Sequence, residues 1–114
     1  MGTEKKVLYV ASSFGHLASF HQPYTAWFAQ QGWTVHAAAG GVPCPLAGVS
    51  RYIPLPFEKS MSSPRNFAAA RAIGRLVRGE RYRMISLHTS LAAYFARLAL
   101  LPMGRRRPVV MNTT

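Results

Sequence analysis

The chain has 114 residues, enough for one domain, and 49% of them are hydrophobic, so we expect a packed core. Lysine and arginine number 14 against three acidic residues, a formal net charge of +11 that favours an anionic partner. Aspartate is absent and the acids are Glu4, Glu58 and Glu80, which excludes a two-carboxylate glycosidase and a carboxylate-built magnesium site. The single cysteine, Cys44, excludes an internal disulfide and suits a reducing compartment.

The first third of the chain predicts two strands joined by a helix. Residues 6–12 (KVLYVAS) form a continuous apolar run, typical of a strand buried on both faces of a parallel sheet. Residues 22–32 predict a helix, with Pro23 in its first turn and Gly32 just past its end. Residues 33–39 predict the second strand, which a pair of glycines ends. Three aromatic residues of the helix are expected to share one face: Tyr24, Trp27 and Phe28.

The middle of the chain predicts a short strand and a long helix. The strand is expected at residues 51–55, where a proline removes one ladder donor. The helix is expected at residues 64–79. Ser63 can cap its amino end, Pro64 suits its first turn, and Gly79 is expected to stop it.

The last third predicts a strand at residues 82–88, a helix at 90–101 and a final strand at 108–114. The helix is apolar almost all round except at Arg97, so we expect it to be buried. Strands that alternate with helices at this spacing predict an α/β fold, a Rossmann-like three-layer domain with a mostly parallel sheet. Because the chain stops at the end of a strand that no helix covers, we expect the domain, residues 1–114, to be truncated at its carboxyl end.

A candidate site follows from this fold, because open parallel sheets bind ligands beyond the carboxyl ends of their strands. Three of the four expected ends carry hydroxyl, imidazole or amide groups, and one is a glycine pair. These ends are Ser12–His16, Ala39–Gly41, His88–Ser90 and Asn112–Thr114. The alternative is that the ends are polar only because loops are polar. The chain lacks a G-x-G-x-x-G fingerprint, a P-loop, a nucleophile elbow and metal-site histidine spacing, so neither a cofactor nor a metal is expected.

Two histidines, His16 and His88, each follow a predicted strand end. A neutral imidazole there can accept a proton from a sugar hydroxyl or orient a phosphate. The alternative is a partly buried histidine bonded to a backbone carbonyl. His21 lies close to the helix start, where it can simply cap or pack, and His36 lies inside a strand and is expected to be structural.

The arginines of the predicted helix at 64–79 gather on one side; they are Arg71, Arg75 and Arg78. A solvated outer face is the plainer interpretation of this stripe. The other interpretation is that it meets anionic lipid headgroups, where each basic side chain contributes about 1 kcal/mol. Three further arginines of a basic loop would join it: Arg105, Arg106 and Arg107.

The segment KVLYVASSFGHLASFHQPYTAWFAQQGWTVHAAAGG resembles the opening of bacterial family 4 glycosyltransferases of the capsular and exopolysaccharide type. In that family a first strand leads to a loop with a histidine, an NFHLPY-like helix start and a G-[WY]-x-V-H stretch. Residues 53–99 resemble the family's I-P-[FL] stretch, Ser-Pro helix start and H-x-H-T strand end. Ser86 replaces the first histidine of that last motif, His88 keeps the second, and Arg83 stands where the family has an acid.

The resemblance spans nearly the whole chain and implies the acceptor-binding, amino-terminal half of a GT-B enzyme. Such an enzyme moves a sugar from a nucleotide-sugar to a lipid-linked or oligosaccharide acceptor, with retention and without a metal or cofactor. The carboxyl-terminal half, absent here, would bind the nucleotide-sugar and carry an E-x7-E motif. The implied location is cytoplasmic, at the inner face of the plasma membrane.

The resemblance also assigns candidate residues. His16 is the catalytic candidate, and the loop from Ser13 to His16 would face the donor diphosphate. The candidate substrate-binding residues are Ser13, Gly15, His21, His88, Thr89, Ser90 and Asn112.

Two other classes of protein stay open. The net charge of +11 alone would suit a nucleic-acid-binding module. Such a module is not the expected one, because no basic recognition helix is evident and no aromatic residues interleave with the basic ones. The other class is a non-catalytic subunit that completes a split glycosyltransferase with a separate chain.

Overall fold

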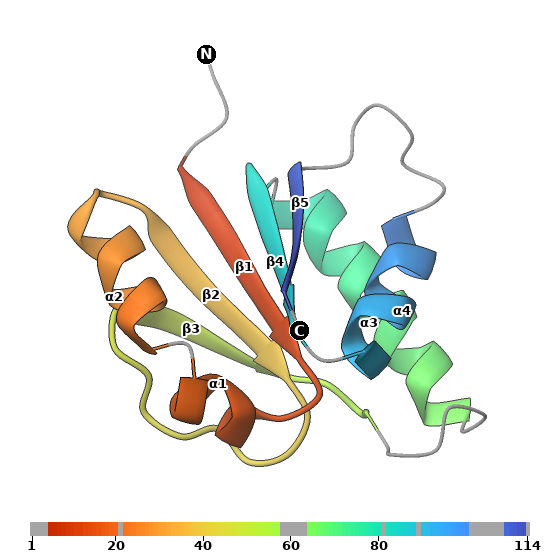
Figure 1. Ribbon diagram of the computed structural model, residues 1–114. Helices are drawn as coiled ribbons and strands as arrows, with labels where there is room; N and C mark the ends of the chain where they lie inside the picture. Colours follow the sequence, from red (N-terminus) through yellow and green to blue (C-terminus); the bar gives the residue numbers. More distant parts are fainter. Residues whose placement is uncertain are drawn as a thin grey trace.

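The computed structural model describes residues 5–20, 22–57, 64–80, 82–88, 90–100 and 109–113. Five strands form one sheet in the order β3-β2-β1-β4-β5, and every neighbouring pair is parallel (Figure 1). The strands are β1 (Lys6–Ala11), β2 (Thr34–Ala39), β3 (Val49–Pro54), β4 (Met84–His88) and β5 (Val109–Thr113). The helices are α1 (Phe14–Phe20), α2 (Gln22–Gln30), α3 (Pro64–Glu80) and α4 (Ser90–Leu100).

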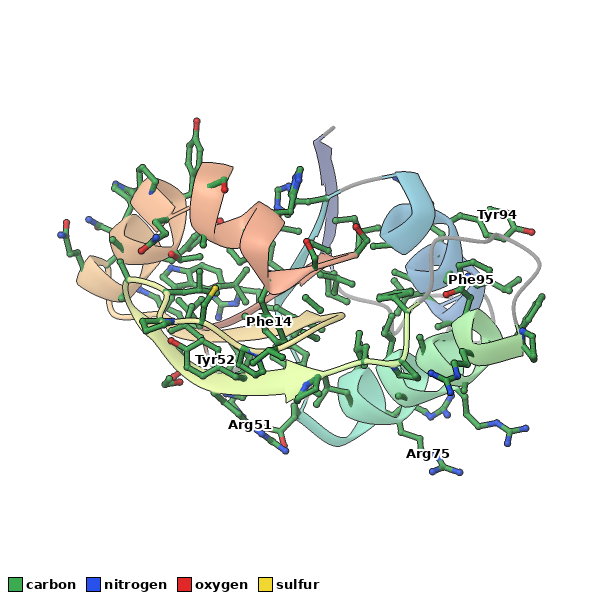
Figure 2. The ribbon with its side chains drawn as sticks, turned by 90° about the horizontal axis from the view of Figure 1, so that it is seen from below. Phe14, Arg51, Tyr52, Arg75, Tyr94 and Phe95 are labelled. Atoms are coloured by element: carbon green, nitrogen blue, oxygen red, sulfur yellow. The ribbon has the colours of Figure 1, made fainter. Side chains whose placement is uncertain are left out.

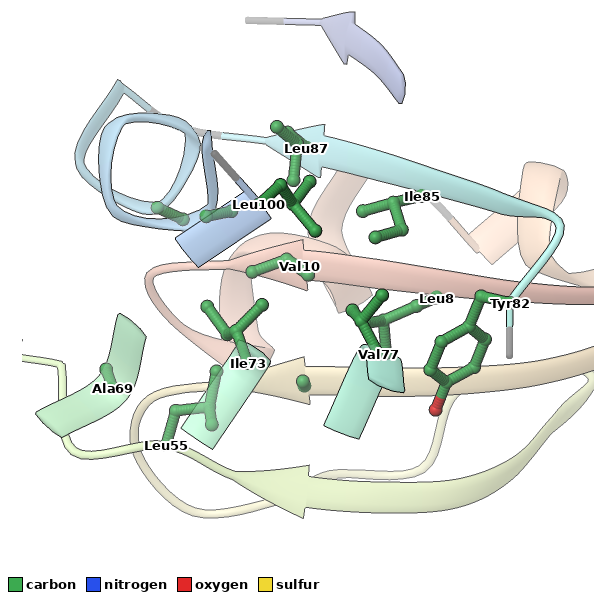
Figure 3. Packing of buried hydrophobic residues seen from close by; sticks show 13 residues of the cluster. Leu8, Val10, Leu55, Ala69, Ile73, Val77, Tyr82, Ile85, Leu87 and Leu100 are labelled. Atoms are coloured by element: carbon green, nitrogen blue, oxygen red, sulfur yellow. The ribbon is translucent and has the colours of Figure 1, made fainter. Parts of the chain in front are cut away.

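Helices cover both faces of the sheet, so the domain has three layers (Figure 1). Alternate residues of β1 point to opposite faces, as the pleat of a strand requires. Leu8 and Val10 pack with α3 and α4 in one buried cluster (Figure 3), and Val7 and Tyr9 pack with α1 and α2 in the other. The prediction of a Rossmann-like α/β domain with a parallel sheet is therefore confirmed, and 3-2-1-4-5 is the strand order of such folds.

The helix α1 occupies the stretch between β1 and α2, where the sequence predicts only a loop from Ser13 to His16. Ser13 caps α1, because its Oγ accepts a hydrogen bond from the backbone N–H of His16 at 3.2 Å. Phe14 and Leu17, three residues apart, bury their side chains against the sheet. A seven-residue helix that holds glycine and serine carries too little periodicity to be recognised from sequence alone.

Three further expectations need correction. The aromatic face of α2 is divided: Phe28 is buried, whereas Tyr24 and Trp27 are 61% and 53% exposed. Gly32 does end α2 with a φ of 87°, but Gly79 lies inside α3 and does not stop it. The helix α4 is buried on one side only, because Tyr94 is 54% exposed. The expected cap Ser63 lies outside the described residues.

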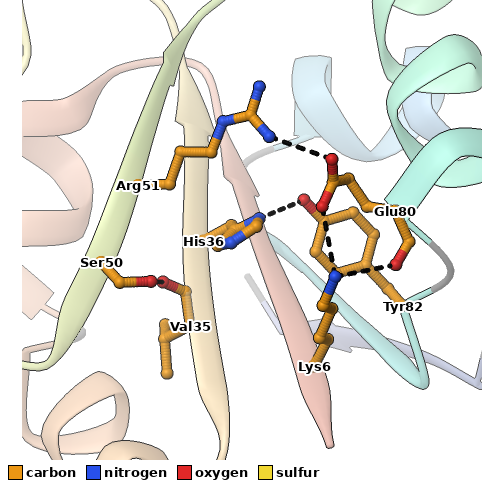
Figure 4. Close-up of polar contacts among 7 residues, drawn as sticks. All are labelled: Lys6, Val35, His36, Ser50, Arg51, Glu80 and Tyr82. Carbon is orange, nitrogen blue, oxygen red and sulfur yellow. Dashed lines mark hydrogen bonds and ion pairs between the residues drawn. The ribbon is translucent and has the colours of Figure 1, made fainter. Parts of the chain in front are cut away.

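An ion cluster ties the amino ends of the strands to the end of α3 (Figure 4). The Glu80 carboxylate accepts hydrogen bonds from Lys6 Nζ at 3.2 Å and from Arg51 Nη1 at 3.1 Å. Beside it, His36 Nδ1 lies 2.6 Å from the buried Tyr82 hydroxyl. Burial lowers the pKa of His36 and raises that of Tyr82, so both groups are neutral at pH 7, and His36 is structural as expected.

The ion cluster predicts a pH-dependent contribution to stability. The hydrogen bond from Lys6 lowers the pKa of Glu80 below its ordinary value of 4.5. The unfolded chain therefore takes up the proton at higher pH than the folded chain. The contribution is complete above about pH 4.5 and is lost as pH falls through the lower folded pKa. We expect Glu80→Gln to cost about 1 kcal/mol at pH 7, because the pair is partly exposed.

Urea unfolding of the parent and of Glu80→Gln across the acid range measures this difference. It should shrink as pH falls below about 4.5, and added salt at pH 7 should also reduce it. A difference that stays constant throughout the acid range would contradict the assigned ion cluster.

Candidate functional site

The strand order places a switch point at the carboxyl edge of the sheet, where open α/β folds have their ligand-binding crevice. From β1 the chain passes through α1 and α2, on one face, to β2, and from β3 through α3, on the other face, to β4. The chain leaves β1 towards β2 on one side and leaves β4, through α4, towards β5 on the other side, so the two connections diverge between β1 and β4. In open α/β sheets this switch point is where ligands bind. The first loop, after Ala11, and His88, the last residue of β4, lie at this point.

The first loop is fixed by a close backbone approach to the end of β2. Gly40 N–H donates to the Ser12 carbonyl at 3.1 Å, and Phe14 N–H donates to the Gly40 carbonyl at 3.1 Å. A Cβ added at Gly40 would lie 2.4 Å from the Ser12 oxygen and 3.3 Å from Phe57 Cβ. No side chain fits there, so the expected glycine strand end is required by packing at this position.

The candidates Ser13, Gly15 and His16 lie together at the start of α1. The Ser13 hydroxyl oxygen is used as the helix cap, and His16 is partly exposed in the first turn. Gly15 is exposed, and the nearest atom to an added Cβ would be Ser13 Oγ at 4.0 Å. Packing does not require a glycine there, so room for a ligand is one explanation for it.

His88 lies deeper than the sequence suggested. Its side chain is 3% exposed and stacks on Tyr9, with ring centroids 5.3 Å apart and an interplanar angle of 11°. Its Nε2 lies 2.6 Å from the Oγ of Ser86, which is 2% exposed. Burial raises the pKa of Tyr9 to about 12, so the phenol stays neutral beside the imidazole. His88 is thus part of the packed layer under the crevice, and its contact with a substrate stays a prediction.

Other candidates are placed only by their backbone or not at all. Ser90 is the first residue of α4, and Asn112 lies in β5 opposite Leu87. Both therefore belong to strand or helix ends near the carboxyl edge. His21 and Thr89, together with Arg105, Arg106 and Arg107, lie outside the described residues.

A basic groove runs along the outer side of α3. Its volume is about 480 Å³, and it holds Arg71 and Arg75 of the predicted stripe, while Arg78 lies beyond it and is exposed. The residues that line it are Pro64, Phe67, Ala68, Arg71, Ala72 and Arg75. Phe67 is 54% exposed, so an aromatic ring does stand among the basic residues. The expectation that no aromatic residue interleaves with the basic ones is wrong here, because Phe67 and Arg71 lie four residues apart and are therefore neighbours on the helix.

The described residues contain no cluster of three histidine, cysteine or acidic side chains that could bind a metal ion. None of the helices in this described part has both the length and the hydropathy to cross a bilayer.

Comparisons with known proteins relate the chain to part of a longer protein. No family model matches the chain. The chain is similar to a Bacillus subtilis (strain 168) protein named "Putative glycosyltransferase EpsD", with 34% identity over 109 residues. The match covers 96% of this chain but 28% of that protein, so the chain spans little more than a quarter of its length. Because the chain matches only this part of that protein, the activity, the donor, the acceptor and the enzyme family are all matters for proposal.

The backbone approach at Gly40 predicts a large cost for the smallest possible side chain. We expect Gly40→Ala to lower the free energy of unfolding by about 1–3 kcal/mol, since the Ser12 backbone must move to make room. Gly79→Ala is the matched control, because Gly79 lies within α3 and nothing lies within 4 Å of an added Cβ. Alanine at this helical position should raise the free energy of unfolding by up to about 1 kcal/mol. Urea unfolding measures both, and equal stabilities of the two variants would refute the fixed first loop.

Proposed function

We propose that this chain is the amino-terminal, acceptor-side domain of a glycosyltransferase. The carrying observation is the 34% identity, over almost the whole chain, to a protein named as a putative glycosyltransferase. The α/β fold and its switch-point crevice support the proposal, because such a crevice is where this architecture binds ligands. The proposed reaction passes a sugar from a nucleotide-sugar donor to a saccharide acceptor in the synthesis of a cell-surface polysaccharide.

The finer assignment is a GT-B enzyme of glycosyltransferase family 4, of which this chain supplies one wall of the cleft. A second domain would bind the nucleotide-sugar and face the first loop. The relative's greater length supports this division, since almost three quarters of it has no counterpart here. No metal or cofactor is proposed, and the donor's leaving diphosphate would be stabilised by hydrogen-bond donors of both domains.

We assign the roles in the crevice as follows. His16 contacts the reacting sugar or phosphate, and Ser13 and Gly15 lie where the donor diphosphate would approach. Further substrate contacts are proposed for His21, which directly precedes α2 in the sequence, and for residues at or after the ends of β4 and β5: His88, Thr89, Ser90 and Asn112. His88 would act from below, held by Ser86 and Tyr9.

The acceptor is proposed to be lipid-linked, which would bring the protein to the inner face of the plasma membrane. The support is electrostatic: a net charge of +11 attracts an anionic surface, and three arginines of α3 are exposed on one side. A nucleic-acid partner is the competing explanation of that charge.

The proposed division of the cleft between two domains predicts that these 114 residues alone do not transfer sugar. One wall of the cleft cannot stabilise the leaving diphosphate, so the rate with any nucleotide-sugar should stay at background. A form of the protein that includes a donor domain, assayed beside the 114-residue chain with the same donors and acceptor extracts, should be active. Robust turnover by the short chain would refute the proposed two-domain cleft.

His16 can be tested against His36 as an internal control in the active, donor-domain-containing form. We expect His16→Ala to lower kcat by about 100- to 10,000-fold, the usual contribution of acid–base or transition-state contacts. Its melting temperature should change little, because the side chain is partly exposed in the first turn of α1.

His36→Ala should show the opposite balance. It removes a buried ring and leaves the Tyr82 hydroxyl unpaired, at a cost of about 1–3 kcal/mol. Activity per folded molecule should remain close to that of the parent. If both variants lose stability and turnover in the same proportion, His16 has no special place in the crevice.

A further inference from the structure

The groove along α3 belongs to neither the crevice nor the buried core. Phe67, Arg71 and Arg75 follow one another at intervals of four residues, so they form one ridge of the helix. The residues next to them in sequence, Ala68 and Ala72, are small, and together they line the groove of about 480 Å³. The surface therefore offers two guanidinium groups beside an apolar floor.

Two exposed aromatic rings at this surface, those of Phe67 and Tyr94, both pack against a buried ring, that of Phe95. Phe95 of α4 is fully buried, and it contacts Phe67 edge to face at 5.3 Å and Tyr94 at 5.0 Å. Phe67 and Tyr94 are both 54% exposed. Tyr94 and Arg75 project on the side of the molecule away from α1 and α2 (Figure 2). Exposed apolar side chains that gather on one face are a feature of surfaces that bind a partner.

The charge of the surface selects an anionic partner. Among the described residues the only carboxylate is Glu80, and Lys6 and Arg51 bind its two oxygens at the far end of α3. No described acid is therefore left to neutralise Arg71 and Arg75. A second copy of this chain, equally basic, would be repelled.

We infer that the α3 groove, with Phe67, Tyr94, Arg71 and Arg75, is a docking surface for an anionic phospholipid membrane. The inference rests on the proposed function and deepens it, since it says which face meets the membrane. Arginine forks bind the headgroup phosphates. The two aromatic rings enter the interfacial region of the bilayer. Tyr94 suits it because its ring is apolar and its hydroxyl is polar, and Phe67 adds apolar contact.

Lipid is favoured over single-stranded nucleic acid by what surrounds the rings. Nucleic-acid grooves place ring faces along a basic track so that successive bases can stack. Here Phe67 is the one aromatic side chain among the described residues that line the groove, and Pro64 and Ala68 beside it offer apolar contact in place of further ring faces. An apolar floor suits the glycerol and upper acyl region of a lipid.

The test compares two double variants of equal net charge in the 114-residue chain. Arg71→Gln/Arg75→Gln removes the groove arginines, and Lys5→Gln/Arg83→Gln removes two exposed cations that precede β1 and β4 at the opposite edge. Binding is measured by co-sedimentation with phosphatidylcholine vesicles, with and without phosphatidylglycerol. Each arginine near an anionic surface is worth about fivefold in affinity, so the groove variant should bind about 30-fold more weakly.

The control variant should lose less than about threefold, and Phe67→Ser should weaken binding with the net charge unchanged. Circular dichroism confirms that each variant is folded, and Tyr94→Ser repeats the aromatic test should Phe67→Ser unfold. Equal losses in the two double variants would overturn the docking surface in favour of diffuse charge attraction. Binding to phosphatidylcholine alone, or tighter binding to an oligonucleotide that the groove variant abolishes, would overturn it as well. Because no sugar transfer is measured, these failures are distinguishable from a failure of the transferase proposal.

Discussion

The structure depends on the burial of a single strand. Residues Val7 to Ala11 of β1 are at most 2% exposed, and β1 is paired with β2 on one edge and β4 on the other. Its two faces supply the centre of two separate hydrophobic clusters, so neither helical layer can form without it. The direction of β1 also places the first loop at the switch point, which makes the position of the candidate site a consequence of core packing.

The two edges of the sheet are chemically different. At the amino edge, Glu80 joins Lys6 and Arg51, so the one described carboxylate is fully occupied far from the crevice. At the carboxyl edge, backbone groups of Ser12 and Gly40 make the contacts, together with the cap at Ser13. Ion pairs therefore stabilise one edge, while the other keeps uncharged groups that can be directed at a ligand.

The strands and the three longer helices could be predicted from the sequence because they carry local signals: apolar runs, Pro64 at a helix start and Gly32 at a helix end. The parts that escaped prediction depend on contacts distant in sequence. The close approach of Gly40 to Ser12 spans 28 residues and has no local signature. For the same reason the sequence indicated only that His88 lies at a strand end, and not that stacking on Tyr9 buries it. The short helix α1 failed because seven residues carry too few helical turns.

The helix α3 runs antiparallel to the strands, and this direction relates the position of the α3 groove to that of the crevice. α3 ends at the amino edge, where Glu80 meets Lys6, so Pro64 and Phe67 at its start lie toward the carboxyl edge that holds the crevice. A membrane docked along the first turns of α3 would therefore lie toward the same end of the domain as the first loop. A lipid-linked acceptor could then enter the crevice while its lipid stays in the bilayer. Basic charge on the opposite edge would bind the same membrane but turn the crevice away from it, so the position of the arginines matters to the proposed reaction more than their number.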